Sequence, residues 1–162
     1  MIVCIILFLL LGKNDSYRLV KIFDFEGSAT VKREDSDEIE VYPSMVLVSG
    51  DEVHLKEGFM TLKLDEDKYV YVEEKTRFAL EATGKEANGK TRIVLIEGAL
   101  TNEIQNPLSS DASYEVHTQN SSMSVRGTVF RVEAYYGEDN VYYTKVSVFD
   151  GKVETRLVYE DG

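Results

Sequence analysis

Apolar and polar residues alternate one by one along most of this chain after residue 16, and this pattern constrains the fold more than any other. The segments from Met60 to Leu64 and from Phe130 to Ala134 both show it. Successive side chains of a β-strand point to opposite faces, so a period of two predicts half-buried strands. Because no segment keeps the 3.6-residue period of a helix, we expect an all-β fold.

Turn-forming residues separate these segments at intervals of about ten residues. Residues 65–67 should join the strands of a hairpin formed by residues 60–64 and 69–72, and residues 84–89 should form a loop. Asp150-Gly151 is expected to form a type I′ hairpin turn, which favours this dipeptide. Short strands joined in this way predict a single antiparallel β sandwich or roll, with a β-solenoid-like roll as the alternative.

Three segments resemble one another: IFDFEGSAT at 22–30, IVLIEGALT at 93–101 and VSVFDGKVET at 146–155. Each joins an apolar strand, an acidic residue and a glycine to the start of a second strand. Glycine tolerates a backbone bend that other residues resist. We therefore predict that Gly27, Gly98 and Gly151 lie at equivalent corners between strands.

The alternating apolar positions also define the expected core. The denser run from Ile93 to Ile96 predicts a strand that is covered on both faces. The predicted core residues are Met60, Leu62, Leu64, Phe78, Leu80, Ile93, Leu95, Val116, Phe130, Val132, Val146 and Val148.

The chain has 29 acidic and 18 basic residues, which give a formal net charge of −11. Phosphate backbones and anionic lipid surfaces attract Lys and Arg, so this charge argues against a nucleic acid partner and against lying flat on a membrane. The acidic stretches 34–38 and 65–67 lack the spacing of a calcium loop and are expected to be solvated. A single cysteine, Cys4, excludes an internal disulfide and a multi-cysteine zinc site. We expect no metal and no cofactor.

The first eleven residues, MIVCIILFLLL, are entirely apolar. A bilayer-spanning helix needs about 20 apolar residues, and a signal peptide begins with basic residues. We expect residues 1–14 to be the remnant of a membrane anchor or signal sequence. Residues 15–162 would then be one extracytoplasmic β domain attached to the cell membrane. A signal-peptide core and a buried N-terminal strand or helix are the alternatives.

Several motifs resemble the FecR-type domain family. FEGSATVKR at 25–33 is similar to the family's opening strand, and MVLVSGDEVHL at 45–55 is similar to its L-x-x-G-D-x-V element. YEVHTQNSSMSVRGTVFRV at 114–132 is similar to its V-x-T segment and R-G-T-x-F-x-V element, and VSVFDGKV at 146–153 ends the pattern. The resemblance implies an exported β domain.

Some FecR-type proteins are transmembrane regulators of sigma factors, with an outer domain that responds to an outer-membrane transporter. No anti-sigma segment is visible ahead of the apolar run and no second signalling domain follows, so sigma-factor control is not among the properties that we carry over from the resemblance. It implies a membrane-anchored sensing or protein-binding module of the bacterial envelope. A structural scaffold domain of the cell envelope is the alternative.

The residues of the family motifs are expected to be mainly structural. Gly50 and Asp51 should form a turn in which the Asp51 carboxylate accepts backbone N–H groups. Gly127 should let two backbones cross closely, Thr128 should bond a neighbouring turn, and Arg126 should pair with an acid. The other motif residues are Gly27, Gly98, Thr118, Phe130, Asp150 and Gly151.

No residue pattern predicts catalysis. The two histidines, His54 and His117, have serines nearby in the sequence at 121, 122 and 124, but no G-x-S-x-G nucleophile elbow is present. Adjacent strand residues also point to opposite faces, which separates a serine from a neighbouring base. We therefore expect a protein that is not an enzyme.

Tyrosine suits a partly exposed interface, because its ring is apolar and its hydroxyl is polar. Tyr135 and Tyr136 precede the loop 137–140, and Tyr142 and Tyr143 follow it. We predict that this hairpin contacts a protein partner, through a sheet face or by strand addition.

Overall fold

The computed structural model describes residues 19–34 and 36–158. The strands are β1 (Val20–Arg33), β2 (Ile39–Glu40), β3 (Val46–Leu47), β4 (Asp51–Leu64), β5 (Lys68–Val72), β6 (Thr76–Thr83), β7 (Lys90–Ile104), β8 (Ser113–His117), β9 (Ser121–Val125), β10 (Thr128–Tyr136), β11 (Tyr142–Asp150) and β12 (Val153–Leu157). A short 3-10 helix, η1 (Glu86–Asn88), lies in the expected loop. The all-β prediction is confirmed. The anchor predicted at 1–14 lies outside the described residues, among which no helix has the length and hydropathy of a membrane span.

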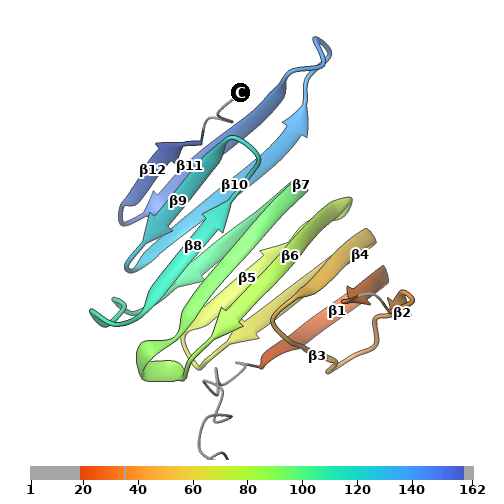
Figure 1. The fold of residues 1–162 in the computed structure, drawn as a ribbon, viewed down its shortest axis with the longest axis horizontal. Helices are drawn as coiled ribbons and strands as arrows, with labels where there is room; N and C mark the ends of the chain where they lie inside the picture. The colour runs from red at the N-terminus through yellow and green to blue at the C-terminus, as the bar shows by residue number, and fades with distance from the viewer. Residues whose placement is uncertain (1–18, 35, 159–162) are drawn as a thin grey trace, which may run out of the picture.

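The strands form one hydrogen-bonded sheet that folds over itself into two layers (Figure 1). Layer A contains β6, β8, β9 and β12, and layer B contains β5, β10 and β11. The long strands β1, β4 and β7 belong to both layers. For example, β4 pairs with β6 through residues 52–55 and with β5 through residues 60–64, which confirms the predicted β4–β5 hairpin. Every strand pair is antiparallel except β7–β8.

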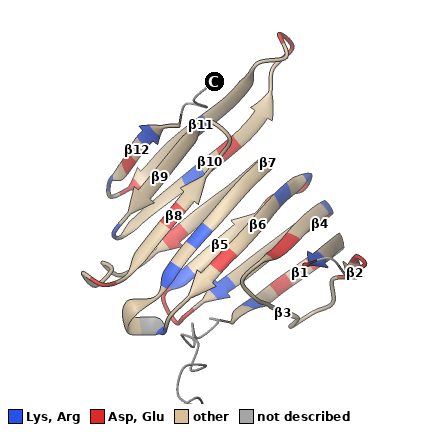
Figure 2. Cartoon of the chain, in the orientation of Figure 1, with Lys and Arg blue, Asp and Glu red and all other residues tan. Residues whose placement is uncertain are grey.

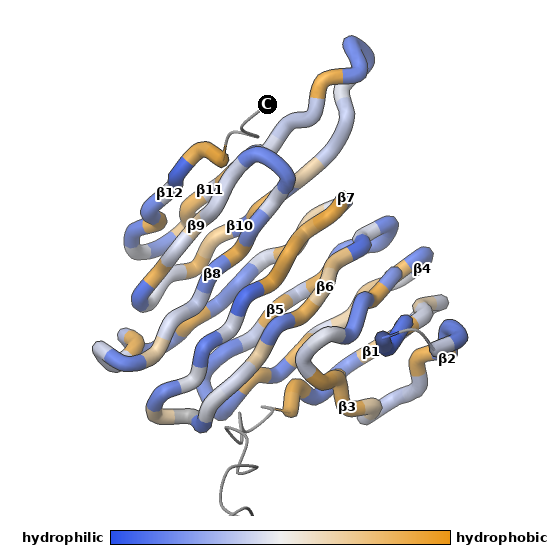
Figure 3. The backbone as a smooth tube through the Cα atoms, viewed as in Figure 1, coloured by the Kyte–Doolittle hydropathy of each residue, from blue (hydrophilic) through white to orange (hydrophobic). Residues whose placement is uncertain are grey.

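Both halves of each long strand face one core, because the inward positions change parity between the layers. In β4 the buried series steps from Leu55 to Met60, and in β7 it steps from Leu95 to Leu100. A step of five residues moves the inward face from odd to even positions. The alternation of apolar and polar residues on either side of these steps is visible along the strands in Figure 3.

A glycine with positive φ lies at each step. Gly27 in β1 pairs with Gly58 in β4, with φ of 114° and 89°, and Gly98 in β7 has a φ of 91°. The prediction of three equivalent corners is therefore wrong. Gly27 and Gly98 lie inside long strands, and Gly151 lies in the connection between β11 and β12. The positions that do correspond share the sequence Glu-Gly-x-x-Thr, at 26–30, 57–61 and 97–101.

The predicted hairpin at Asp150-Gly151 is also wrong. β11 pairs with β10 and β12 pairs with β9, so this connection crosses from layer B to layer A. A type I′ turn needs positive φ at both central residues, and of these two only Gly151, at 84°, has it.

The core lies between the layers and contains all of the predicted core residues except two. Val146 is only partly buried against the core, and Val148 is 47% exposed, because β11 forms the open edge of layer B. The prediction that residues 93–96 are covered on both faces is wrong as well. Figure 3 shows a continuous hydrophobic stretch in β7, but Ile96 points outward and is 38% exposed.

Candidate functional site

The β10–β11 hairpin extends beyond the rest of the sheet and carries the four predicted contact tyrosines (Figure 1). Tyr135 lies opposite Tyr143, with ring centroids 5.7 Å apart and an interplanar angle of 22°. Tyr136 lies opposite Tyr142, at 5.1 Å and 72°. Since neighbouring residues of a strand point to opposite faces, the hairpin presents a stacked pair on one face and an edge-to-face pair on the other.

The tip of the hairpin is fixed by its own hydrogen bonds. The Gly137 N–H donates to the Val141 carbonyl, and the Asn140 N–H donates to the Gly137 carbonyl, both at 2.9 Å. The Asp139 carboxylate accepts the Tyr143 hydroxyl at 2.7 Å and the Val141 N–H at 3.1 Å. The bond from Tyr143 is the main reason why the pKa of Asp139 is lowered, and it also raises the pKa of Tyr143. The loop is therefore preorganised.

The edge-to-face pair packs against layer A. The Tyr142 hydroxyl donates to the Ile96 carbonyl at 3.1 Å, and the Tyr136 hydroxyl donates to the Gln119 side-chain oxygen at 3.2 Å. Burial is the main cause that raises the pKa of Tyr142. A pocket of about 270 Å³ adjoins the two rings, and its lining includes Val94 and Ile96. The hairpin thus combines exposed aromatic rings with a small apolar pocket.

A polar bridge between the layers holds the base of the hairpin. The hydroxyls of Thr118 and Thr144 are 2.8 Å apart, and Thr144 donates to the Asn120 side-chain oxygen at 2.6 Å. The Asn120 amide in turn donates to the Tyr142 carbonyl at 3.2 Å. Thr118 and Asn120 belong to the β8–β9 turn, so the bridge ties layer A to β11. Sequence reasoning singled out Thr118 but missed Asn120, because nothing local indicates that a turn residue reaches another layer.

The motif residues at the start of β4 form a turn. The Asp51 side chain is fully buried, forms a bidentate ion pair with Arg33 at 2.7 and 2.8 Å, and accepts the Val48 N–H at 2.8 Å. The bond to Asp51 is the main cause that raises the pKa of Arg33. Gly50 has a φ of 96°, and its N–H donates to the Leu80 carbonyl at 2.7 Å.

The Arg126-Gly127-Thr128 turn packs against the β11–β12 connection. The Thr128 hydroxyl donates to the Lys152 carbonyl at 2.9 Å, and a Cβ atom on Gly151 would lie 2.5 Å from the Gly127 carbonyl oxygen. The ion pair expected for Arg126 is not found among the described residues, and its side chain is exposed. The next motif residue, Phe130, is fully buried in the core.

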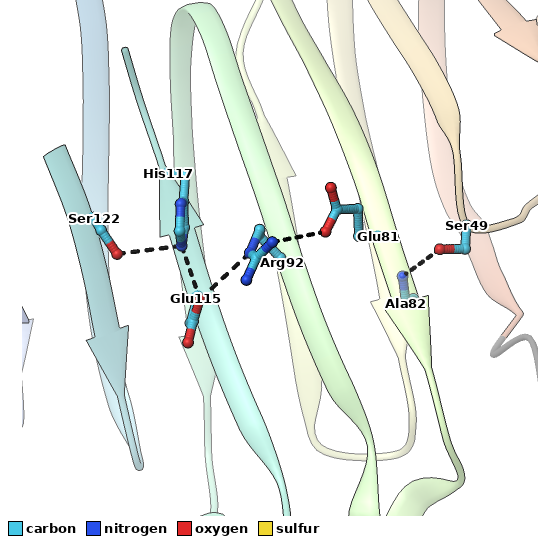
Figure 4. A network of polar contacts seen from close by, with 7 residues as sticks. All are labelled: Ser49, Glu81, Ala82, Arg92, Glu115, His117 and Ser122. Carbon is cyan, nitrogen blue, oxygen red and sulfur yellow. Dashed lines mark hydrogen bonds and ion pairs between the residues drawn. The ribbon is translucent and has the colours of Figure 1, made fainter. Parts of the chain in front are cut away.

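Figure 4 shows a chain of polar contacts across the outer face of layer A. His117 Nε2 lies 2.8 Å from Glu115 Oε2 and 3.2 Å from Ser122 Oγ. Arg92 extends the chain to Glu115 at 3.4 Å and to Glu81 at 3.1 Å. Burial alone would raise the pKa of Glu115, but its bond to His117 and the nearby charges outweigh burial and lower that pKa.

This histidine does not form a serine-type triad, although the structure brings Ser122, His117 and Glu115 together. In such a triad the hydroxyl and the carboxylate bind opposite nitrogens of the imidazole. Here both groups contact Nε2. The arrangement is a cross-strand ladder of polar groups. His54 lies elsewhere, opposite Arg77 in the β4–β6 pairing. Within residues 19–34 and 36–158, no group of three His, Cys, Asp or Glu side chains is placed to hold a metal ion.

The family model described as FecR protein matches residues 52–154, which is more than half of the chain, so this protein belongs to the FecR protein family. The match includes the β10–β11 hairpin and the Arg126-Gly127-Thr128 turn. The resembling segment 25–33 lies outside the matched range, in β1, which pairs along the length of β4. Comparisons with curated proteins and with solved structures gave no match.

Proposed function

We propose that this chain is a non-catalytic binding module of the bacterial envelope, anchored to the membrane by its N-terminal segment, and that its β10–β11 hairpin binds a protein partner. Membership of the FecR family, whose members are generally membrane-associated signalling regulators, supports the sensing role. The apolar run at 1–11 supports the anchor and an extracytoplasmic location. Glu115 and Ser122 contact the same nitrogen of His117, and this arrangement supports a role other than serine-type catalysis.

The exposure of the hairpin tyrosines carries the proposal. Tyr135, Tyr136 and Tyr143 are 42%, 60% and 41% exposed, on a hairpin whose loop is fixed by hydrogen bonds. Rigid aromatic side chains lose little conformational entropy when a partner covers them, which is why they dominate binding energy at protein interfaces. The pocket beside Tyr136 and Tyr142 offers room for one apolar side chain of the partner.

The free edge of β11 indicates how the partner binds. Among the described strands, β11 pairs with β10 alone, so its outer N–H and C=O groups are open to strand addition. Val148 and Phe149 are 47% and 65% exposed along this strand. Exposed acids at the hairpin tip, Glu138 and Asp139, add negative charge. The partner that fits is an extended segment with apolar side chains and a Lys or Arg near the tip.

Site-specific crosslinking in cells tests the proposal with the full chain. A photoreactive residue at Glu138 should capture one protein partner, and replacing Tyr136 and Tyr143 by Ala should abolish the adduct. Tyr42→Ala is the matched control, because Tyr42 is 57% exposed but lies in the segment between β2 and β3. An adduct that persists in the Tyr136 and Tyr143 variant would contradict the proposal, as would turnover of a substrate by the purified chain.

A further inference from the structure

A separate cleft lies at the opposite end of β10 from the loop of the β10–β11 hairpin. An open cleft of about 850 Å³ is bounded by the β7–β8 loop, the β9–β10 turn and the β11–β12 connection. Arg126, Gly127, Thr128 and Gly151 line it, together with Lys152. The family motif that packs these turns together therefore also forms part of the wall of this cleft.

Arg126 differs from every other arginine within residues 19–34 and 36–158, because it alone forms no ion pair. The arginines that contact a carboxylate are Arg33, Arg77, Arg92, Arg131 and Arg156. In a chain with a net charge of −11, an arginine has many acidic groups available to it. Lys152, the other cation of the cleft, likewise has no ion pair among the described residues.

Backbone contacts hold the turns that carry these two residues against each other. The Thr128 hydroxyl donates to the carbonyl of Lys152 at 2.9 Å, and the Leu108 N–H donates to the carbonyl of Arg126 at 2.6 Å. A side chain on Gly151 would press on the Gly127 carbonyl, so the two turns make contact through bare backbone. Figure 2 shows basic segments at both the β9–β10 and β11–β12 turns. The backbone positions from which the two side chains extend are therefore fixed.

The remaining lining suits an anion. The wall includes Ser113 and Ser124, whose hydroxyls can donate to a ligand. The hydroxyls of Ser109 and Ser110 also lie in the wall, but they already donate to the Ala87 carbonyl and to the Asp111 carboxylate. The single carboxylate of the lining, Glu154, forms an exposed ion pair with Arg156 at 2.6 Å, outside the cleft lining. Two cations with no ion pair among the described residues, Arg126 and Lys152, line the same cleft as these two free serine hydroxyls.

We propose that this cleft binds an oxyanion, namely a carboxylate or phosphate group of a small ligand. The guanidinium of Arg126 would bind two oxygens of the group through its planar fork, and the Lys152 ammonium would supply a second positive charge. The motif arginine then acts as the ligand-binding group of a turn whose glycine and threonine fix its position. This site is independent of the partner surface on the β10–β11 hairpin.

Isothermal titration calorimetry of the full chain tests the site with inorganic phosphate, with succinate and with uncharged glycerol. At least one anion should bind saturably, glycerol should not, and raising the salt concentration should weaken binding. Binding of phosphate alone or of succinate alone would identify the group that the cleft prefers. Arg126→Gln should weaken binding roughly tenfold, since a charge-assisted hydrogen bond is lost.

Lys152→Gln should weaken anion binding by roughly threefold, because it removes one positive charge but leaves the two-pronged hydrogen bonding of the Arg126 guanidinium in place. Lys32→Gln is the matched control, since Lys32 is exposed on β1, outside the cleft, and should leave the affinity unchanged. Circular dichroism checks that each variant is folded. If Arg126→Gln does not fold, the affinity of Lys152→Gln tests the proposal instead. No saturable binding of either anion, or equal affinity in all folded variants, would overturn the proposal.

Discussion

Gly27 and Gly58 lie directly opposite each other in β1 and β4, and neither position has room for a Cβ atom. A Cβ on Gly27 would collide with the carbonyl of Glu57, and a Cβ on Gly58 would collide with the carbonyl of Glu26. Both glycines also have positive φ. The pair thus allows two long strands to stay hydrogen-bonded where they pass together from one layer to the other.

Gly58→Ala should lower the free energy of unfolding by about 3 kcal/mol or more, because backbone strain adds to a backbone collision. Gly50→Ala is the matched control, since Gly50 has a similar φ of 96° but no atom within 4 Å of a built Cβ. Strain alone should cost about 1 kcal/mol there. Urea unfolding measures both values, and equal losses would mean that the close approach at Gly58 is unimportant.

Phe130→Ala should lower the free energy of unfolding by about 3–5 kcal/mol, because Phe130 is fully buried and its removal leaves a cavity. Val148→Ala should change that free energy by less than about 0.5 kcal/mol, as expected for an exposed site. Val148 is the residue that pairs with Phe130 on β11, so both variants alter the same register pair. A large loss for Val148→Ala would show that something covers the β11 edge in solution.

Asp51→Asn should lower the free energy of unfolding by about 2–3 kcal/mol, because a fully buried carboxylate loses its charge-assisted bonds to Arg33. The partner Arg33 is itself 39% exposed, so water relieves part of the penalty. Glu66→Gln removes an ion pair whose carboxylate is 85% exposed, and it should change the free energy by less than about 0.5 kcal/mol. Chemical unfolding that gave both variants the same small effect would contradict this ranking.

The fold class and the β4–β5 hairpin could be predicted because they depend on local alternation and on a polar loop. The connection between the layers at Asp150-Gly151 could not be predicted, because the same dipeptide occurs both in hairpin turns and in connections of this kind. Which strands pair is decided by contacts far apart in the sequence, such as β12 with β9. The layer changes did leave a local signal, the repeated Glu-Gly-x-x-Thr, which a comparison of all glycine contexts would have found.

The tyrosine hairpin could be predicted for a similar reason, since all four tyrosines lie within nine residues of chain. The cleft at Arg126 could not be predicted, because its walls come from three connections that are distant in sequence. An arginine in a turn predicts an ion pair when acids are abundant. Only the folded arrangement shows that its neighbourhood holds Lys152 and serine hydroxyls instead.

Stability should fall as the solution is acidified below about pH 5, because several carboxylates have lower pKa values in the folded chain. The bond from Arg131 is the main cause that lowers the pKa of Glu73, whose ordinary value is 4.5. For Asp67, with an ordinary value of 3.8, burial opposes the shift, but bonds from Lys68 and Asn106 outweigh it. The pKa of Glu115 is lowered as well.

The sign follows from proton binding. Between the ordinary pKa and the lowered one, the unfolded chain binds more protons than the folded chain, so each unit of acidification favours unfolding. The stabilisation is fully present above the ordinary values and is lost as the pH falls through the folded values. Urea unfolding from pH 7 to pH 3 should show this loss, and Glu73→Gln should make it shallower. Glu57→Gln, at an exposed carboxylate with no ion pair among the described residues, should leave the profile unchanged. A flat profile across this range would show that these ion pairs do not form in solution.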